Sequence, residues 1–292
     1  MAKSKNQLSI VMPCLNEAKN LGALLPKLKE LHAEAEILVI DDGSTDKSVE
    51  ICRQFDVKVI SHPHPLGNGA AIKTGARNAS GEIIVFMDAD GQHKPKDIQR
   101  LLDKLAEGYD MVVGARKSSS HASKKRLLGN TVFNRLASFM TGQKIEDLTS
   151  GFRAVRAKHF RKFLYLLPNG FSYPTTSTMA FFRSALPVAY IPIKAGKREG
   201  KSKIKLLKDG LRFFIIILKI GALFSPMRLF LPTSAACFLL GVANHISTYA
   251  TSGNFSNGTL LLYVASVFIF LMGILSEQIS SLHYRNSENE HK

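Results

Sequence analysis

The sequence has 292 residues, enough for one large domain or two small ones, and its 39 Lys+Arg against 23 Asp+Glu give a net charge of +16. This balance points to anionic partners such as nucleic acid, anionic lipid or phosphorylated substrates. The basic residues do not form one long run, so we do not expect a disordered tail that binds nucleic acid. Cys14, Cys52 and Cys237 show neither metal spacing nor a disulfide framework, so we expect small buried thiols in a reducing cytosol. The N-terminus shows no signal-peptide pattern.

Short apolar runs alternate with amphipathic stretches along the first two thirds of the sequence. We expect strands at Leu8–Met12, Glu36–Ile40, Val57–Ile60, Ile83–Met87, Asp110–Val113 and Val188–Ile193. We expect helices at Glu17–Leu31, at Ala70–Ala79, at Pro95–Ala106 and at Lys124–Met140, and a further helix that follows Asp46 and ends at about Phe55. We expect a loop at Asp147–Arg153. This alternation predicts an α/β domain with a mainly parallel sheet covered on both faces, with the polar segments after the strands gathered along one edge.

The strand predicted at Ile83–Met87 leads directly into Asp88, Ala89, Asp90 and Gln92. Two carboxylates so close together repel each other unless a cation lies between them. Their oxygen ligands, with the amide of Gln92, suit Mg²⁺ or Mn²⁺ rather than zinc, and such ions usually complete their shell with phosphate oxygens. The alternative is a loop of capping acids before the helix that begins near Pro95.

The usual nucleotide-binding fingerprints are absent. The segment Pro13–Glu17 stands where a dinucleotide fold has G-x-G-x-x-G, and Leu66–Gly69 lacks the ending of a P-loop. The basic, glycine-punctuated segment at 194–203 follows the last predicted strand. Its cations either clamp a pyrophosphate or form a solvated surface loop.

The last third of the sequence has the composition of a membrane-attached region. A helix at Ile204–Phe224 would place on one face the basic residues Lys201, Lys205, Lys208, Arg212 and Lys219. Such a helix either lies in the interface of an anionic membrane or packs on the domain with its basic face exposed to solvent. Leu229–Ala250 and Leu260–Ile279 are each long enough to cross a ~30 Å hydrocarbon layer.

The distribution of charge around the two predicted spans indicates their orientation. Their linker, Thr251–Thr259, has no Lys or Arg, whereas both outer flanks have basic residues. The positive-inside rule therefore predicts a cytoplasmic catalytic domain and tail. Asn244 and His245 lie within the first span, and we expect them to bond to the neighbouring helix rather than to carry function.

Six motifs in this order resemble those of family 2 glycosyltransferases, and most closely the polyprenol-phosphate (dolichol-phosphate mannose synthase-like) hexosyltransferases of the bacterial type with two C-terminal spans. The resemblance covers about residues 8–225. The motifs are Pro13–Glu17, Asp41–Asp46, Asp88–His93, Gly114–Arg116, Asp147–Arg153 and Arg198–Lys203. The resemblance implies a GT-A nucleotide-sugar-binding domain at 1–203, an interfacial helix region at 204–227, two transmembrane helices within 228–283 (about 229–250 and 260–280) and a tail at 284–292.

The resemblance also implies roles for individual residues. Around the base and ribose it places Pro13, Leu15, Glu17, Ile40 and Asp42. It implies that Asp88 and Ala89 lie against the donor. It also implies that Asp88, Asp90 and Gln92 bind the metal. Catalytic roles would fall to Asp90, Arg116 and Arg198, with Lys203 closing over the pyrophosphate and Arg126 contacting the lipid phosphate.

The function implied is membrane-bound transfer of a sugar, with inversion, from a UDP- or GDP-linked donor to a polyprenyl phosphate, with undecaprenyl phosphate as the expected acceptor. A phosphate oxygen is already anionic at neutral pH, so a strong general base is less necessary than for a sugar hydroxyl. We expect an inner-membrane protein that contacts lipids and no nucleic acid, and we leave open a homo-oligomer. The segment Tyr173–Ser177 lacks the acidic residue that many relatives carry there. This difference argues against a role for a carboxylate of this segment in recognising the sugar.

Three other functions compete with this interpretation. One is a glycosyltransferase with a sugar-hydroxyl acceptor, and another is a processive polysaccharide synthase, whose Gln-x-x-Arg-Trp motif is missing from a sequence without tryptophan. The third is a non-catalytic membrane-tethered binding module, which the presence of Asp88, Asp90, Gln92, Arg116 and Arg198 disfavours.

Overall fold

The protein is described from a computed structural model, in which the chain divides into two compact units, residues 1–135 with 144–213 and residues 136–143 with 214–292. The residues that the structure describes are 7–116, 124–170, 172–194, 196, 215, 218–219, 221–222 and 225–289, without the side chains of 124–130 and 283–289. The predicted basic loop and most of the predicted interfacial helix lie outside these ranges. Arg198 and Lys203 are therefore not placed, and neither is the side chain of Arg126.

The first unit is built on a seven-stranded sheet with the order β3-β2-β1-β4-β6-β5-β7. The strands are β1 Leu8–Cys14, β2 Glu36–Asp41, β3 Lys58–Ser61, β4 Ile83–Phe86, β5 Met111–Arg116, β6 Arg153–Arg156 and β7 Val188–Ile193. Only β6 runs antiparallel to its neighbours β4 and β5. The other six strands therefore end at one edge of the sheet, as the sequence predicts, and this is called the carboxyl edge below.

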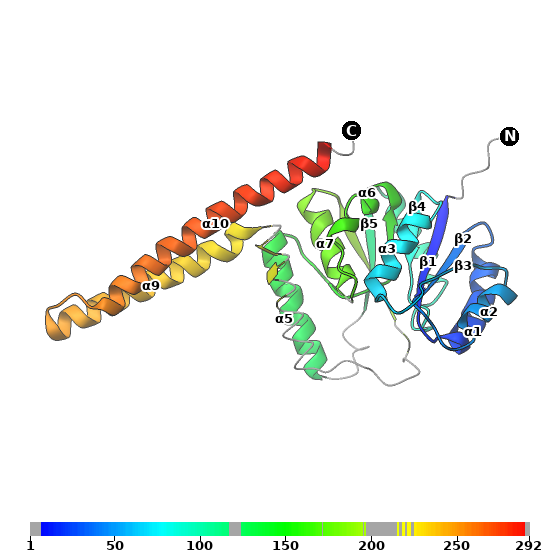
Figure 1. The fold of residues 1–292 in the computed structure, drawn as a ribbon, viewed down its shortest axis with the longest axis horizontal. Coiled ribbons are helices and arrows are strands. Elements are labelled where there is room, and N and C mark those ends of the chain that lie inside the picture. Colours follow the sequence, from blue (N-terminus) through cyan, green and yellow to red (C-terminus); the bar gives the residue numbers. More distant parts are fainter. Residues whose placement is uncertain are drawn as a thin grey trace. The chain divides into compact units, whose positions relative to one another are not determined.

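Helices cover both faces of this sheet (Figure 1). They are α1 Ala18–Leu31, α2 Ser48–Gln54, α3 Asn68–Asn78, α4 Asp97–Ala106, α6 Ala157–Arg161 and α7 Tyr173–Arg183, with the 3-10 helix η2 at Leu164–Leu166. A further helix, α5 Lys124–Thr141, is divided between the two units. The main core lies between the sheet and α1, α2 and α4, and it includes Leu25, Leu101 and Val85. On the other face Phe86 packs on Phe160 of α6, with ring centroids 4.7 Å apart. Because β4 is covered on both faces, its apolar side chains are removed from water.

Most predicted elements are confirmed to within a few residues, but the segment after residue 147 differs. Arg153, predicted to end a loop, begins the antiparallel strand β6, whose four residues are too short and too basic to show an alternating pattern. The helices α6 and α7 were not predicted. The first is very short, and in the second a run of hydroxyl side chains, which favour turns, hides the helical period.

The second unit contains two long helices, α9 Pro226–Ser252 and α10 Asn257–Asn289, which form a hairpin (Figure 1). Within the described residues, Pro226–Ser252 and Asn257–Leu282 are long and apolar enough to cross a membrane. Only 11% and 17% of their most apolar windows are buried inside the protein, unlike the core helix of a soluble domain. The helices approach closely at Gly241, where an added Cβ would lie 2.8 Å from Tyr263.

Polar contacts inside the hairpin join its two helices. The side-chain amide of Asn244 donates to the Thr259 hydroxyl at 3.0 Å, as expected for an interhelical contact. His245 instead packs its ring on Phe255, and its Nδ1 has no hydrogen-bond partner among the described residues, so the expected bond is not observed. Cys237 is only partly buried in the hairpin, which corrects the prediction of three buried cysteines; Cys14 and Cys52 are buried and free.

Candidate active site at the carboxyl edge of the sheet

The acidic pair lies directly beyond β4, at the point where the strand order reverses. The strand β4 pairs with β1 on one side and with β6 on the other, and the Met87 amide extends the ladder by donating to the Val11 carbonyl. Parallel α/β sheets bind ligands at such reversals, outside the carboxyl ends of their strands. The side chain of Asp88 is 34% exposed, so it can still reach a ligand.

A tight turn follows Asp88 and contains the other two predicted metal ligands, Asp90 and Gln92. Asp90 Oδ1 accepts a hydrogen bond from the Gln92 amide at 3.1 Å, and Gly91 between them has φ +72°, which glycine adopts without strain. Among the described residues there is no group of three or more His, Cys, Asp and Glu side chains that could hold a metal. The set that remains, Asp88, Asp90 and Gln92, offers oxygen ligands only. It fits Mg²⁺ or Mn²⁺ completed by phosphate oxygens, and it does not fit zinc.

The backbone at Gly151 forms a wall beside Asp88. A Cβ added there would lie 3.2 Å from Asp88 Oδ2 and 3.1 Å from the Tyr173 hydroxyl. That hydroxyl donates to the Gly151 carbonyl at 3.0 Å, and burial raises the pKa of Tyr173 well above its usual range. The phenol is therefore a fixed neutral group, and the backbone comes this close to the Asp88 carboxylate because Gly151 has no side chain.

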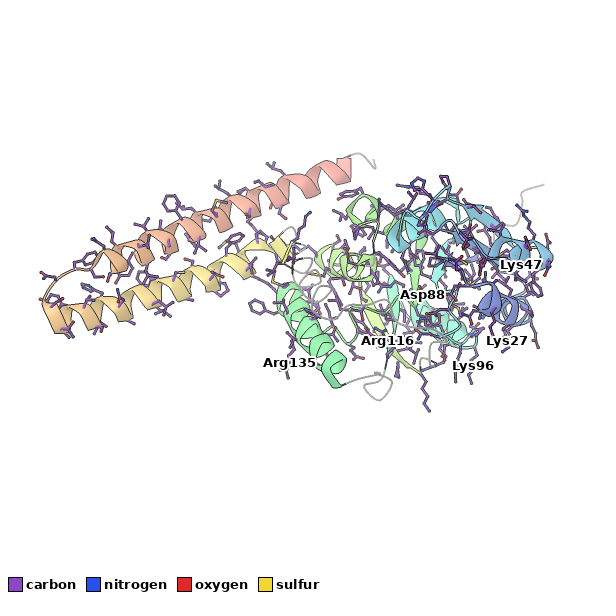
Figure 2. The ribbon with its side chains drawn as sticks, turned by 60° about the horizontal axis from the view of Figure 1, so that its bottom comes forward. Lys27, Lys47, Asp88, Lys96, Arg116 and Arg135 are labelled. Carbon is purple, nitrogen blue, oxygen red and sulfur yellow. The ribbon has the colours of Figure 1, made fainter. Side chains whose placement is uncertain are left out.

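Arg116, at the end of β5, is held by a carboxylate that does not belong to the predicted site. Its Nε and Nη2 donate to the two oxygens of Asp147 at 2.8 and 3.0 Å, and its backbone amide donates to the same carboxylate. Nη2 also donates to the Thr149 hydroxyl. This two-point contact fixes the plane of the guanidinium. Both Arg116 and Asp88 are labelled in Figure 2, and the charge of Asp88 helps to raise the pKa of Arg116.

The Arg116–Asp147 pair is buried enough to perturb both groups. Burial by itself would raise the pKa of Asp147, but the hydrogen bonds and charge of Arg116 hold that pKa below its ordinary value. Burial likewise opposes the charged form of Arg116, and the contact with Asp147 outweighs it and raises the arginine pKa. Both groups are therefore ionised at neutral pH.

His93 follows the metal-ligand turn and is almost fully buried. Its ring stacks on Phe152, and its Nε2 lies 3.9 Å from Asp88 Oδ2. Burial lowers the pKa of His93 to about 4, and the charges of Asp90 and Arg116 act in opposite directions. The imidazole is neutral at physiological pH.

The predicted base and ribose residues lie on the loops after β1 and β2. Leu15 is exposed, and the carboxylate of Glu17 accepts a hydrogen bond from Asn20 at 2.6 Å. Asn16 has φ +60°, and its side-chain oxygen accepts from the Thr45 amide at 2.8 Å, which ties the two loops together. These contacts give both loops a defined geometry without ligand.

Four of the predicted pocket residues have surroundings that the sequence did not show. The Asp42 carboxylate accepts bonds from the amides of Leu66 and Gly67 and contacts His62, each at 2.8 Å. It therefore anchors the turn before α3, in addition to any contact with a ligand. Pro13 is buried, and Ile40 and Ala89 are 0% and 1% exposed, so these three residues present almost no surface to a ligand.

Arg153 is a fully buried cation near this site, at the start of β6. It donates to the Ser150 and Pro174 carbonyls and to the hydroxyls of Ser177 and Thr178. The hydrogen bonds to Pro174, Ser177 and Thr178 join β6 to the first turns of α7. No carboxylate of the described residues forms an ion pair with Arg153, and burial lowers its pKa.

Sequence reasoning assigned no role to Asp147, His93, Gly151, Tyr173 or Arg153. Four of the five lie inside quoted motifs, so the signal was present at the level of the motif. Their individual roles depend on contacts across elements, which spacing along the chain does not reveal.

Together, a mainly parallel sheet of GT-A type, an acidic pair at its switch point and two apolar C-terminal helices define a GT-A-like α/β domain followed by a membrane hairpin. Residues 9–164 match Glycosyl transferase family 2, and residues 225–282 match the GtrB C-terminal hairpin. The chain belongs to glycosyl transferase family 2.

Known relatives agree with this assignment. The chain is 28% identical over 299 residues to the undecaprenyl-phosphate 4-deoxy-4-formamido-L-arabinose transferase of Photorhabdus laumondii, covering 95% of this chain and 90% of that protein. It is 29% identical over 208 residues to the dolichyl-phosphate hexose transferase of Haloferax volcanii, covering 70% and 90%. The fold resembles glucosyl-3-phosphoglycerate synthase from Mycobacterium tuberculosis with a TM-score of 0.62 at 20% identity, covering 75% of this chain and 81% of that one, a likeness that shows the fold alone.

Proposed function

We propose that this protein transfers a sugar from a UDP- or GDP-linked donor to a polyprenyl phosphate at the cytoplasmic face of the membrane. The observation that carries the proposal is the acidic pair Asp88 and Asp90 at the switch point of a family 2 domain whose chain continues into an apolar hairpin. The hairpin would keep the site near lipid acceptors, and nucleotide-sugars would reach it from the cytoplasm. The names of the two relatives above support a polyprenyl or dolichyl phosphate as acceptor.

The donor diphosphate would be bound through Mg²⁺ or Mn²⁺ held by Asp88, Asp90 and Gln92. The support is chemical: three oxygen ligands on one tight turn suit a hard divalent ion. When bound, such an ion neutralises negative charge on the diphosphate. Asp90 would act mainly as a ligand and positioning group rather than as a base.

The residues around the turn suit the departure of a charged leaving group. Arg116 is fixed by Asp147 through Nε and Nη2, and no hydrogen bond from its Nη1 to the described residues is observed. That nitrogen could donate to a phosphate oxygen of the donor or of the acceptor. Arg198 and Lys203 would close over the pyrophosphate, and Arg126 would contact the lipid phosphate.

The reaction would be a direct displacement with inversion. An anionic oxygen of the polyprenyl phosphate attacks the anomeric carbon and forms the new C–O bond. The bond from that carbon to the β-phosphate oxygen breaks, and its electron pair leaves with the nucleoside diphosphate. No proton has to be removed from this nucleophile, so no strong general base is required at the site.

The donor's base and ribose would lie over the loops after β1 and β2, against Pro13, Leu15, Glu17, Ile40 and Asp42. The exposed Leu15 offers an apolar surface, and Glu17 offers a carboxylate to ribose hydroxyls. Asp88 and Ala89 would lie against the donor on the other side. The bonds that Asp42 already makes to the turn before α3 indicate that it would shape the pocket as well as contact the ligand.

The test is a donor and acceptor screen. Purified full-length protein in detergent is incubated with undecaprenyl phosphate and a panel of UDP- and GDP-sugars, with and without Mn²⁺, and the lipid is analysed by mass spectrometry. The expected result is a glycosylated lipid phosphate formed only with divalent cation. Absence of a metal-dependent lipid product with every donor would reject the proposal. Transfer to a glycolipid hydroxyl instead would show that the acceptor is a sugar hydroxyl and not a polyprenyl phosphate.

A further inference from the structure

His93 is held rigidly between two segments of the first unit. Its side chain is only 6% exposed, and its ring stacks on Phe152 with centroids 4.8 Å apart and planes 11° from parallel. Phe152 is itself held in place, because its side chain is completely buried and its carbonyl accepts a hydrogen bond from the Gly114 amide at 2.9 Å. The imidazole therefore has little freedom to rotate away from its neighbours.

Packing alone does not account for a histidine at this position. Nδ1 is buried and has no hydrogen-bond partner among the described residues. A buried polar atom left unsatisfied costs about 1–3 kcal/mol, whereas a phenyl ring would stack on Phe152 without that cost. The other nitrogen, Nε2, faces Asp88 Oδ2 at 3.9 Å, slightly beyond hydrogen-bond length.

Asp88 thus lies between a ring nitrogen and a backbone wall. The position of a Cβ on Gly151 is 3.2 Å from the same Oδ2 that Nε2 faces. A carboxylate confined in this way needs only a small movement to accept a hydrogen bond from the imidazole. Carboxylates that bind metals are commonly oriented by such a donor, and its loss typically weakens metal affinity or activity 10–100-fold.

We propose that His93 is a positioning residue whose Nε2–H donates to Asp88 Oδ2 and fixes the orientation in which Asp88 binds the divalent cation. This inference rests on the proposed metal site of Asp88, Asp90 and Gln92. It assigns the histidine no contact with substrate.

The experiment measures Mn²⁺ binding to the full-length protein in detergent, by electron paramagnetic resonance of free Mn²⁺ without nucleotide. His93→Phe keeps the stacked ring and removes both nitrogens. We expect it to weaken Mn²⁺ binding about 10–100-fold while the melting temperature is unchanged or higher. His93→Gln places an amide donor near the position of Nε2, and we expect it to restore most of the affinity.

A matched control is available at the opposite edge of the sheet, where His159 Nδ1 lies 2.9 Å from Asp110 Oδ1. His159→Phe should leave Mn²⁺ affinity unchanged. The inference is overturned if His93→Phe binds Mn²⁺ as the unchanged protein does, or if His93→Gln binds as weakly as His93→Phe. Failure of the unchanged protein to bind Mn²⁺ would instead reject the metal site itself, and the inference with it.

Discussion

The α/β domain and the C-terminal hairpin use similar apolar side chains in opposite ways. In the domain, Ile84, Val85 and Phe86 of β4 are completely buried between helical layers. In the hairpin, Leu261 and Phe268 are 69% and 65% exposed. Burial of apolar surface stabilises the first, whereas the second is stable only where its surroundings are themselves apolar. The difference shows that hydrophobic composition alone does not distinguish a core from a membrane surface.

Buried polar side chains also have different surroundings in the two regions. Near the carboxyl edge, Asp147, His93 and Arg153 are buried beside groups that could bind a ligand. In the hairpin, Ser234 donates to the Ser266 carbonyl across the helix pair at 2.9 Å, and Asn244 makes a similar contact. We therefore expect polar substitutions to affect chemistry in the domain and only packing in the hairpin.

The largest effect should come from Asp90→Asn, which removes one negative charge and little volume. We expect a loss of about a thousandfold or more in kcat, equivalent to about 4 kcal/mol, because charge stabilisation at the leaving group is lost. The melting temperature, followed by circular dichroism, should not change. Unchanged turnover would reject Asp90 as a metal ligand and would break the contrast between the two regions.

Arg153→Met should be the most destabilising of the variants considered. It removes the guanidinium that donates to the Ser150 and Pro174 carbonyls and to the hydroxyls of Ser177 and Thr178, and we expect a loss of about 3 kcal/mol with a lower melting temperature. The exposed Lys158→Met serves as the control and should change stability by less than about 0.5 kcal/mol. A stability loss no larger than that of the control would mean that the buried cation does not join β6 to α7.

Asp147→Asn should reduce both stability and turnover. Removing this charge weakens the two-point contact with Arg116, and we expect a cost of about 2 kcal/mol and a lower kcat because the guanidinium is no longer fixed. Asp110→Asn is the control, since Asp110 pairs with His159 at the opposite edge. It should lower the melting temperature without changing kcat; a similar loss of kcat in both would argue against a specific role for Asp147.

The same variant predicts a pH dependence. Because the folded pKa of Asp147 lies below its ordinary 3.8, its contribution is fully present above pH 3.8 and is lost as pH falls through the lower folded value. Melting temperatures of the unchanged protein and of Asp147→Asn should therefore converge as the pH falls below 3.8. A constant difference down to the acid transition would contradict the lowered pKa.

The smallest effect should come from Asn244→Val in the hairpin. Interhelical polar contacts in membrane proteins contribute about 0.6 kcal/mol on average, so the melting temperature should fall slightly and the turnover number should stay the same. A large loss of turnover would show that the hairpin's polar side chains take part in function. That result would remove the contrast between the two regions.

Sequence patterns were sufficient for most of the fold because its strands and helices have strong local signals. The run ending at Met87 is apolar throughout, and α1 places Leu21, Leu24, Leu25 and Leu28 on one buried face. The Asp88–Asp90–Gln92 turn was predictable for the same reason, since all its members are close neighbours in the chain. Both hairpin helices were predictable from length and composition, although each extends beyond its predicted span.

The contacts around those residues were decided only by tertiary structure. Arg116 and Asp147 are neighbours because the antiparallel β6 pairs with β5 and begins at the carboxyl edge, so the loop before β6 lies beside the end of β5. His93 is neutral and faces Asp88 because Phe152, from the distant start of β6, covers its ring. The sequence by itself determined which residue types stand at the strand ends, because apolar periodicity is local. Partners, burial and pKa depend on which segments the sheet brings together, and no local pattern encodes that.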